Sequence, residues 1–428
     1  MRKIILLLTL CLSYTAYGQT FEQFFDYKTL RVDYIFSGTH NKQDISVDDY
    51  ICYPNWAGKT TKLNINPNKG NGVIEVKDIA TNQLIYTNSF SSLFQEWIDT
   101  DEAKHLKRAF ENTFLIPLPK KKAEVTVRLY NLAHKEVARL SHLVDPDDIL
   151  ITKKGVENIT PYRILHKGSV KNPIDVAILA EGYTASQLGQ FYRDAEKAMQ
   201  SIFAHEPFKS NKQAFNFYAV GSISEDTGVS VPRQGKWRNT LFNAHFDTFY
   251  SERYLTTRNI KAVHNALAGI PYEHIIILAN TSEYGGGGIY NSYTLTAAHH
   301  EHFEPVVVHE FGHSFGGLAD EYFYEQDVMS DVYPLTVEPW EANITTLVKF
   351  ESKWKHLLKS GTPIPTPSKD SKRFPIGVYE GGGYAFKGIY RPADNCRMRT
   401  NTYPEFCPVC QAALLKLIKF YTEEDKDK

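Results

Sequence analysis

The sequence predicts an α+β protein in which a β-sandwich precedes an α/β domain. Between residues 20 and 155, short runs of alternating polar and apolar residues are separated by turn-forming stretches, a spacing typical of a sandwich. From about residue 160, apolar strand-like runs alternate with helical patterns, which favours a mixed sheet covered by helices. We therefore expect a β-sandwich domain at residues 20–155 and a second domain at residues 160–428. The candidate catalytic residues fall in the second domain.

The composition is that of an ordinary globular protein. The chain has 428 residues, of which 23% are charged and 42% hydrophobic, and this length is enough for two or three domains. A formal net charge of −1 provides no strong field to attract nucleic acid or an anionic membrane surface. We therefore expect no nucleic-acid partner.

The N-terminal segment, residues 1–18, has the pattern of a secretory signal peptide. Two basic residues precede the short apolar run Ile4–Leu12, and Ala16 and Gly18 are small residues suited to a cleavage site. The apolar run is too short to span a bilayer, and no other stretch reaches the required length. The sequence thus predicts an exported protein that is periplasmic, on the cell surface or extracellular, with no membrane span.

The first domain is expected to consist mainly of short strands. Extended or alternating runs occur at Leu30–Phe36, Val73–Val76, Gln83–Tyr86 and Glu124–Tyr130. One helical insertion is expected at Asp101–Glu111. The histidines of this region are scattered, so we expect no catalytic site in it.

The second domain alternates strands and helices. Buried strands are expected at Ile174–Ala180, Phe215–Val220 and Ile275–Ala279. A helix capped near Thr184 is expected to run to about His205, and a second helix to cover Ile260–Ala268.

Four successive glycines, Gly285–Gly288, precede the H-E-x-x-H segment. No Lys-Ser/Thr pair follows them, so a phosphate-binding loop is disfavoured. We expect a flexible loop that leads into an edge strand at Ile289–Leu295. An exposed edge offers backbone groups to an extended peptide, which suggests a substrate-binding role.

The most informative motif is H-E-x-x-H, formed by His309, Glu310 and His313. Residues four apart share one face of a helix, so both imidazoles can face one ion. Zn²⁺ accepts imidazole nitrogens, and Glu310 stands where a carboxylate can take a proton from a water that the ion activates. The apolar run Val306–Val308 and a proline at position 305 favour a buried helix that begins near Glu304.

The third metal ligand is expected in the chain that follows the motif helix. Gly316 can end the helix, as in metzincin-type sites, whose third ligand is ten residues after the first His. Here that residue is Ala319, which has no donor atom, so Asp320 is the expected ligand and Glu321 the second choice. Either carboxylate can alternatively hydrogen-bond a ligand histidine. A possible later helix offers two further carboxylates, Glu338 and Glu341.

The segment Asn395–Arg399 resembles a metzincin Met-turn, in which a methionine such as Met398 lies beneath the metal ligands. A methionine that fills a gap in the core is the alternative. Three tyrosines are candidates for stabilising an oxyanion: Tyr322, Tyr384 and Tyr403.

Four cysteines follow the predicted signal peptide: Cys52, Cys396, Cys407 and Cys410. In an oxidising compartment some of them can pair. Cys407 and Cys410 form C-x-x-C, but neither a redox site nor a structural zinc site is favoured by its surroundings in the sequence. We expect a disulfide from Cys396 to Cys407 or Cys410.

Taken together, the segments His309–Tyr322, Cys396–Met398 and Phe406–Cys410 resemble the bacterial IgA-peptidase family of zinc metalloendopeptidases. The resemblance extends over about residues 160 to 425. Residues 20–155 resemble the β-sandwich domain that precedes the peptidase domain in members of this family from gut bacteria.

This resemblance implies a metzincin-like fold, secretion and one catalytic Zn²⁺. It places His309, His313 and Asp320 on the metal, with Glu310 as the general base that activates water for peptide-bond hydrolysis. Protein or peptide substrates are then expected, without any implication that IgA is cleaved. Two other functions remain open: a non-catalytic surface binding protein that retains a metal site, and a zinc hydrolase of a non-protein amide.

Overall fold

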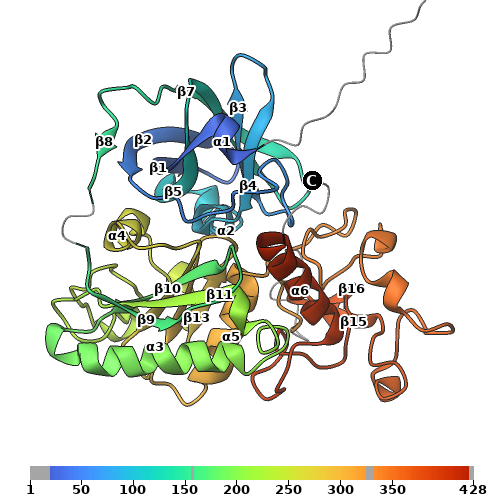
Figure 1. Cartoon of the computed structure of the whole chain (residues 1–428). Coiled ribbons are helices and arrows are strands. Elements are labelled where there is room, and N and C mark those ends of the chain that lie inside the picture. Colours follow the sequence, from blue (N-terminus) through green and yellow to red (C-terminus); the bar gives the residue numbers. More distant parts are fainter. Residues whose placement is uncertain (1–19, 156–158, 324–331, 424–428) are drawn as a thin grey trace, which may run out of the picture.

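The chain folds as a mixed α/β protein with a strand-rich N-terminal part (Figure 1). The computed structural model describes residues 20–155, 159–323 and 332–423. The predicted signal peptide, residues 1–18, lies outside the described residues. Among the helices of the described part, none is both long and apolar enough to cross a membrane.

Two four-stranded sheets form the N-terminal part, together with helices α1 (Phe21–Phe24) and α2 (Leu93–Trp97). The first sheet has the order β5-β1-β2-β8, with strands β1 Phe25–Gly38, β2 Gln43–Tyr53, β5 Arg108–Pro119 and β8 Thr152–Lys153. The second has the order β4-β3-β6-β7, with strands β3 Gly72–Asp78, β4 Leu84–Phe90, β6 Ala123–Tyr130 and β7 Glu136–Val144. Alternate apolar side chains of both sheets meet in one core, including Val32, Val76 and Val127.

The helix predicted at Asp101–Glu111 is wrong. Only Glu102–Lys104 forms a short 3₁₀ turn, and strand β5 starts at Arg108. This strand pairs antiparallel with β1 along most of its length, for example Phe110 with Phe36. Pairing with a distant strand therefore outweighs the weak local helical pattern.

The second part contains a six-stranded mixed sheet of order β13-β14-β12-β10-β11-β9. Neighbouring strands among β10, β11, β12 and β14 are parallel, while the two outer strands, β9 and β13, run antiparallel. The strands are β9 Tyr162–His166, β10 Ile174–Glu181, β11 Phe215–Val220, β12 His274–Ala279, β13 Gly286–Ile289 and β14 Tyr293–Ala297.

Helices and the N-terminal part bury the two faces of this sheet. Side chains such as Val176 and Ile178 pack in the core that includes residues of α3 (Leu188–Phe203), α5 (Phe303–Ser314) and α6 (Pro408–Thr422). The intervening residues, such as Ala177 and Leu179, join the core that contains α4 (Ile260–Ala266) and the strand-rich part. In Figure 1 the strand-rich part (blue to teal) accordingly lies above the sheet, and α3 (green) runs beneath it.

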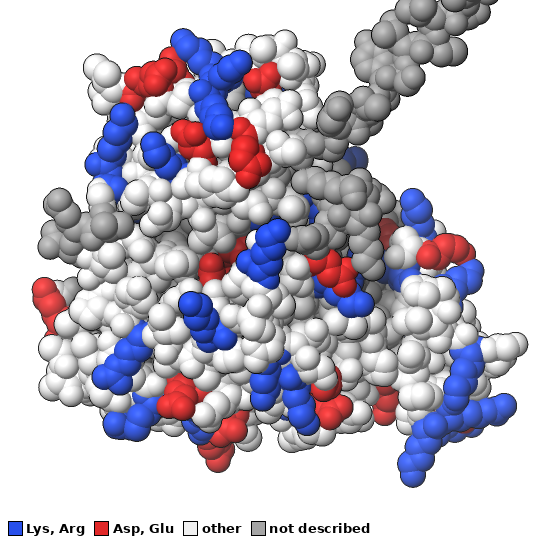
Figure 2. Space-filling model, viewed as in Figure 1, with Lys and Arg blue, Asp and Glu red and all other residues white. Residues whose placement is uncertain are grey.

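A hairpin of β15 (Tyr379–Gly382) and β16 (Ala385–Arg391) precedes the last helix. The surface carries no large region of one charge on the face in Figure 2, where basic and acidic side chains are interspersed. This matches the near-neutral composition.

Candidate metal centre

Helix α5 places the two histidines of the motif on one face. Pro305 occupies its first turn, and Val307, Val308 and Phe311 are buried against the sheet and α3. This packing turns the opposite face, with the motif histidines, toward a site that is only partly shielded from solvent. The His309 and His313 side chains retain 12% and 15% exposure, and their Nε2 atoms lie 3.0 Å apart.

A turn after α5 brings Asp320 back to the histidines. Gly317 has φ +59°, a conformation that glycine adopts without strain, and its amide donates to the His313 carbonyl oxygen. Asn343 stabilises the returning chain, because its side chain bonds both the amide and the carbonyl of Ala319. Asp320 Oδ1 then lies 3.0 Å from His309 Nε2 and 3.3 Å from His313 Nε2.

These separations fit three ligands of a single ion. Bond lengths of ~2.0–2.1 Å in a tetrahedral zinc site place neighbouring ligand atoms ~3.3 Å apart. Both histidines direct Nδ1 at a backbone carbonyl, His309 at Arg397 and His313 at Leu318. A carbonyl only accepts hydrogen bonds, so Nδ1 carries the proton and the Nε2 lone pair faces Asp320 when the ring is neutral. Such a concentration of lone pairs and negative charge suits a cation.

The same proximity shifts the titration of the metal-free site. Burial alone would lower the pKa of His313, but the Asp320 carboxylate outweighs it and raises this pKa to about 9. Burial would raise the pKa of Asp320, but the two histidines outweigh it and the pKa is lowered. Burial raises the pKa of Glu310 above its usual value. The His313 and Asp320 side chains therefore stabilise each other's charged forms.

The glycine run lies directly against the motif helix. A Cβ atom on Gly288 would stand 2.3 Å from the Glu310 carbonyl oxygen, and one on Gly286 would stand 2.9 Å from Glu310 Oε1. Only glycine allows this close approach of strand β13 to α5. Glu310 is thus enclosed between the motif helix and the edge strand.

The predicted position of the edge strand is wrong. Gly286–Ile289 itself forms the outermost strand, and the range Ile289–Leu295 contains the turn and the start of β14. The outer side of β13 is also occupied in part, since the Gly286 amide donates to the Arg253 carbonyl and the Leu255 amide donates to the Gly286 carbonyl. A substrate strand therefore does not find the whole of this edge free.

Glu321 is turned away from the histidines. Its Oε1 accepts a hydrogen bond from Asn343 and lies 3.1 Å from Cys410 Sγ. Two groups of side chains in the described part of the chain could hold a metal ion, and neither contains Glu338 or Glu341.

The predicted disulfide is wrong. The thiols of Cys396, Cys407 and Cys410 are free, and the Cys396 and Cys410 sulfurs are 3.8 Å apart, whereas a disulfide needs ~2.05 Å. Local sequence could not reveal this, because the distance between the sulfurs depends on how the segment that contains Cys396 packs against the start of helix α6.

Met398 is fully buried beside the motif helix. Its sulfur packs against Gly312, where a Cβ atom would stand only 2.7 Å away. The Met398 carbonyl accepts the amide of Glu321 at 2.8 Å. The segment that resembles a Met-turn therefore contacts both the motif helix and the chain that carries Asp320.

Several residues near the centre were not singled out in the sequence, or only weakly. The Tyr384 hydroxyl donates to Asp320 Oδ2. The Arg253 guanidinium contributes to lowering the pKa of Glu310, in opposition to burial. Glu96, from α2 of the N-terminal part, accepts a hydrogen bond from Tyr254. No local signal links these residues, because the fold brings them from three distant segments.

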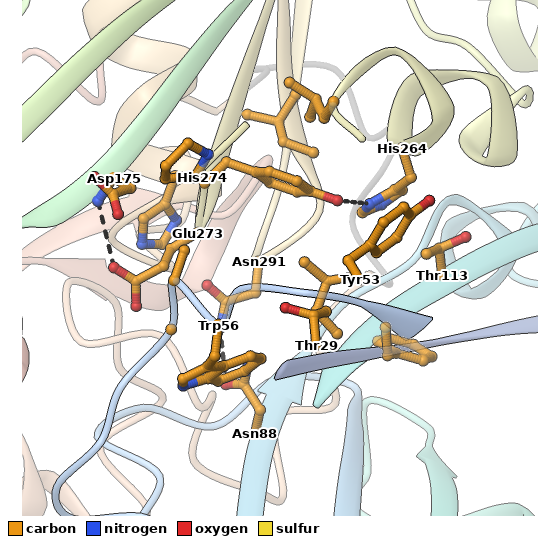
Figure 3. A pocket seen from close by; sticks show the side chains of 18 of the residues that line it. Thr29, Tyr53, Trp56, Asn88, Thr113, Asp175, His264, Glu273, His274 and Asn291 are labelled. Atoms are coloured by element: carbon orange, nitrogen blue, oxygen red, sulfur yellow. Dashed lines mark hydrogen bonds between the residues drawn. The ribbon is translucent and has the colours of Figure 1, made fainter. Parts of the chain in front are cut away.

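A separate cavity of about 340 Å³ lies between the two parts of the chain (Figure 3). Tyr53 and Trp56 line it from the N-terminal part, and His264 and Glu273 line it from the second part. The candidate metal-binding side chains do not line it. Its polar groups include a hydrogen bond of 2.6 Å between Tyr272 and His264.

Comparison with known families decides the assignment. The family described as IgA Peptidase M64 matches residues 163–375 and 368–418, and the family described as Peptidase M64 N-terminus matches residues 20–141. The chain belongs to the M64 peptidase family. The two matches together cover both the strand-rich part and the part with the candidate metal centre, which confirms the resemblance noted in the sequence. No curated protein matches the chain. Membership of the M64 family supports a peptidase that acts on protein substrates.

Proposed function

We propose that this chain is a secreted zinc-dependent metalloendopeptidase that hydrolyses peptide bonds in protein substrates. The observation that carries the proposal is the convergence of three donor atoms, His309 Nε2, His313 Nε2 and Asp320 Oδ1, within 3.3 Å of one another. Glu310 is adjacent on the same helix. Two imidazoles and a carboxylate are a ligand set that leaves a fourth position of Zn²⁺ open.

Asp320 is the third ligand in this proposal, one residue later than in the usual metzincin spacing. The turn at Gly316 and Gly317 takes up the additional residue. Glu321 is unsuited to this role, because its carboxylate already contacts Asn343 and Cys410.

In the proposed mechanism Glu310 moves the proton. When bound, Zn²⁺ acidifies a water molecule and polarises the scissile carbonyl group. Glu310 accepts the proton of the attacking water and then donates it to the leaving amine.

Neighbouring residues orient the three proposed metal ligands. The His309 and His313 rings are held by the carbonyls of Arg397 and Leu318, which direct Nε2 toward the ion. The Tyr384 hydroxyl holds the second oxygen of Asp320. These contacts allow the ligands to keep their geometry when a substrate replaces solvent.

The finer fold and the location are part of the same proposal. The Met398 side chain against Gly312 supports a metzincin-like arrangement. The two packed sheets of the N-terminal part support a β-sandwich domain. The N-terminal charge and hydrophobicity pattern supports export through a signal peptide at residues 1–18.

Digestion of casein and of a peptide library, with and without a chelator, tests the proposal. Glu310→Gln is expected to lower the rate of cleavage by about 10²–10⁴-fold and to leave bound zinc unchanged. Glu304→Gln is the control, since this glutamate lies on the same helix with a side chain that is 58% exposed. Full proteolysis by Glu310→Gln would contradict the mechanism. Hydrolysis of a non-protein amide without any peptide cleavage would contradict the substrate class.

A further inference from the structure

A second group of side chains that could hold a metal ion lies next to the proposed catalytic centre. Glu321, Cys396, Cys407 and Cys410 are all buried, and one ligand atom from each lies within 4.8 Å of the others. Cys52, the remaining described cysteine, is on strand β2 of the N-terminal part and is not in the group. We call this group the cysteine cluster.

The distances in the cysteine cluster are those of a metal site. With Zn–S bonds of ~2.3 Å, tetrahedral geometry separates two sulfurs by ~3.8 Å. The Cys396 and Cys410 sulfurs are 3.8 Å apart. Glu321 Oε1 lies 3.1 Å from Cys410 Sγ and 4.0 Å from Cys407 Sγ, values on either side of the ~3.5 Å expected between an oxygen and a sulfur ligand.

The start of helix α6 brings two of the cysteine sulfurs close together. Cys407 is the N-cap residue of α6, Pro408 follows it, and Cys410 lies in the first turn of the helix. This places two sulfurs of a C-x-x-C sequence at one helix end, a spacing common in zinc sites. The amides of Cys407 and Met398 point at Cys396 Sγ, at 3.1 Å and 3.5 Å. Amide donors stabilise the negative charge of a thiolate.

The composition of the cysteine cluster also disfavours a disulfide. Pairing any two of the three sulfurs would leave the third unpaired beside a buried carboxylate. Glu321 is 0% exposed, and its Oε2 accepts no hydrogen bond within the described part of the chain. A cation bound here would compensate the charge of this carboxylate and give its second oxygen a partner. Arg391 interacts with it electrostatically, but the two do not form an ion pair in the described structure.

We propose that Glu321, Cys396, Cys407 and Cys410 bind a second zinc ion with a structural role. Three thiolates and a carboxylate fill all four positions of a tetrahedral ion, which is the pattern of structural rather than catalytic zinc. Binding releases the three thiol protons to solvent.

This second ion has a physical connection to the first site. Glu321 follows Asp320 directly, and its amide donates to the Met398 carbonyl. Arg397, between Cys396 and Met398, supplies the carbonyl that orients His309. A metal ion in the cysteine cluster therefore joins the two segments that hold Asp320 and the His309 ring. The site itself does not depend on peptidase activity.

The metal content of the purified chain and of His309→Ala/His313→Ala provides the first test. We expect two zinc ions per wild-type chain and one per chain of the double variant. Inductively coupled plasma mass spectrometry measures this zinc content. One ion in the wild type and none in the double variant would overturn the proposal. One ion in both proteins would support the cysteine cluster and contradict the proposed catalytic site, so the two proposals are separable.

Cobalt provides the second test. The double variant loaded with Co²⁺ is expected to show intense near-ultraviolet absorption from thiolate-to-cobalt charge transfer. Cys52→Ser in the same background should retain this absorption, and Cys407→Ser/Cys410→Ser should lose it. The His309→Ala/His313→Ala protein keeps all residues of the cysteine cluster. Its cobalt spectrum therefore tests the proposal even if the cysteine variants do not fold. Absence of the absorption there, or a disulfide between cluster cysteines found by peptide mass spectrometry, would overturn the proposal.

Discussion

Asp320 and Glu321 are adjacent in the chain, but their carboxylates belong to different clusters. Asp320 Oδ1 lies 3.0 Å from His309 Nε2, whereas Glu321 Oε1 lies 3.1 Å from Cys410 Sγ. The hydrogen bond from the Glu321 amide to the Met398 carbonyl holds the chain where the two side chains diverge. The register of this short segment therefore decides which carboxylate faces the histidines.

Asp320→Ala is expected to lose the catalytic ion. It removes a proposed ligand, so zinc affinity at that site should fall by more than the ~10–100-fold that loss of a ligand's hydrogen-bond partner costs. Competition with a chromophoric chelator measures this affinity. Glu304→Gln is the control and should leave this site's zinc affinity unchanged, since this glutamate lies in the first turn of helix α5 with a side chain that is 58% exposed. Wild-type affinity in Asp320→Ala would exclude Asp320 as the third ligand.

Tyr384→Phe is expected to weaken metal binding without abolishing it. The hydroxyl donates to Asp320 Oδ2, and removing such a partner of a ligand costs ~10–100-fold in metal affinity. Tyr403→Phe is the control, because Tyr403 is exposed. The same chelator competition applies. A fall in kcat with unchanged metal affinity would instead place Tyr384 on the reacting substrate.

Gly288→Ala is expected to destabilise the fold around Glu310. Its methyl group would stand 2.3 Å from the Glu310 carbonyl oxygen and 2.8 Å from His313 Cβ, so strand β13 or helix α5 has to move. Such overpacking costs about 1–3 kcal/mol, measurable as a lower midpoint in urea. Gly189→Ala is the control. It lies in helix α3 with its nearest neighbour 3.9 Å from the added atom, and it should be neutral or stabilising. Equal midpoints for both variants would refute close packing at Gly288.

The raised pKa of Glu96 is expected to make the stability of the fold depend on pH. Burial raises its pKa from 4.5 to about 7, and the hydrogen bond from Tyr254 only partly opposes this. The folded state therefore keeps the Glu96 proton over a range in which the unfolded state releases it. This contribution to stability is full below pH 4.5 and is lost as the pH rises to about 7.

Glu96→Gln removes this titration. Relative to the variant, the chelated wild-type protein should lose about 1–3 kcal/mol of unfolding free energy between about pH 5 and pH 8. Urea unfolding of both proteins at the two pH values measures the difference. If wild type and variant keep the same difference at both pH values, the pKa of Glu96 is not raised in the folded state.

The sequence by itself determined the elements with strong local patterns. The strands around Val176 and Ile276 consist of continuous apolar runs, and the spacing of His309 and His313 places both on one helix face whatever surrounds them. The family was also readable from the sequence, because its motif is a contiguous run of residues.

Only the tertiary structure decided the positions of groups that are far apart in the sequence and close in space. Helix α6 and the segment after Cys396 place the three sulfurs near Glu321, and strand β1 converts the expected helix near Asp101 into strand β5. The approach of Arg253 to strand β13 is another example. The physical reason is that periodicity reports which face of an element is apolar, whereas sulfur–sulfur distances, edge pairing and carboxylate direction depend on how separate elements pack.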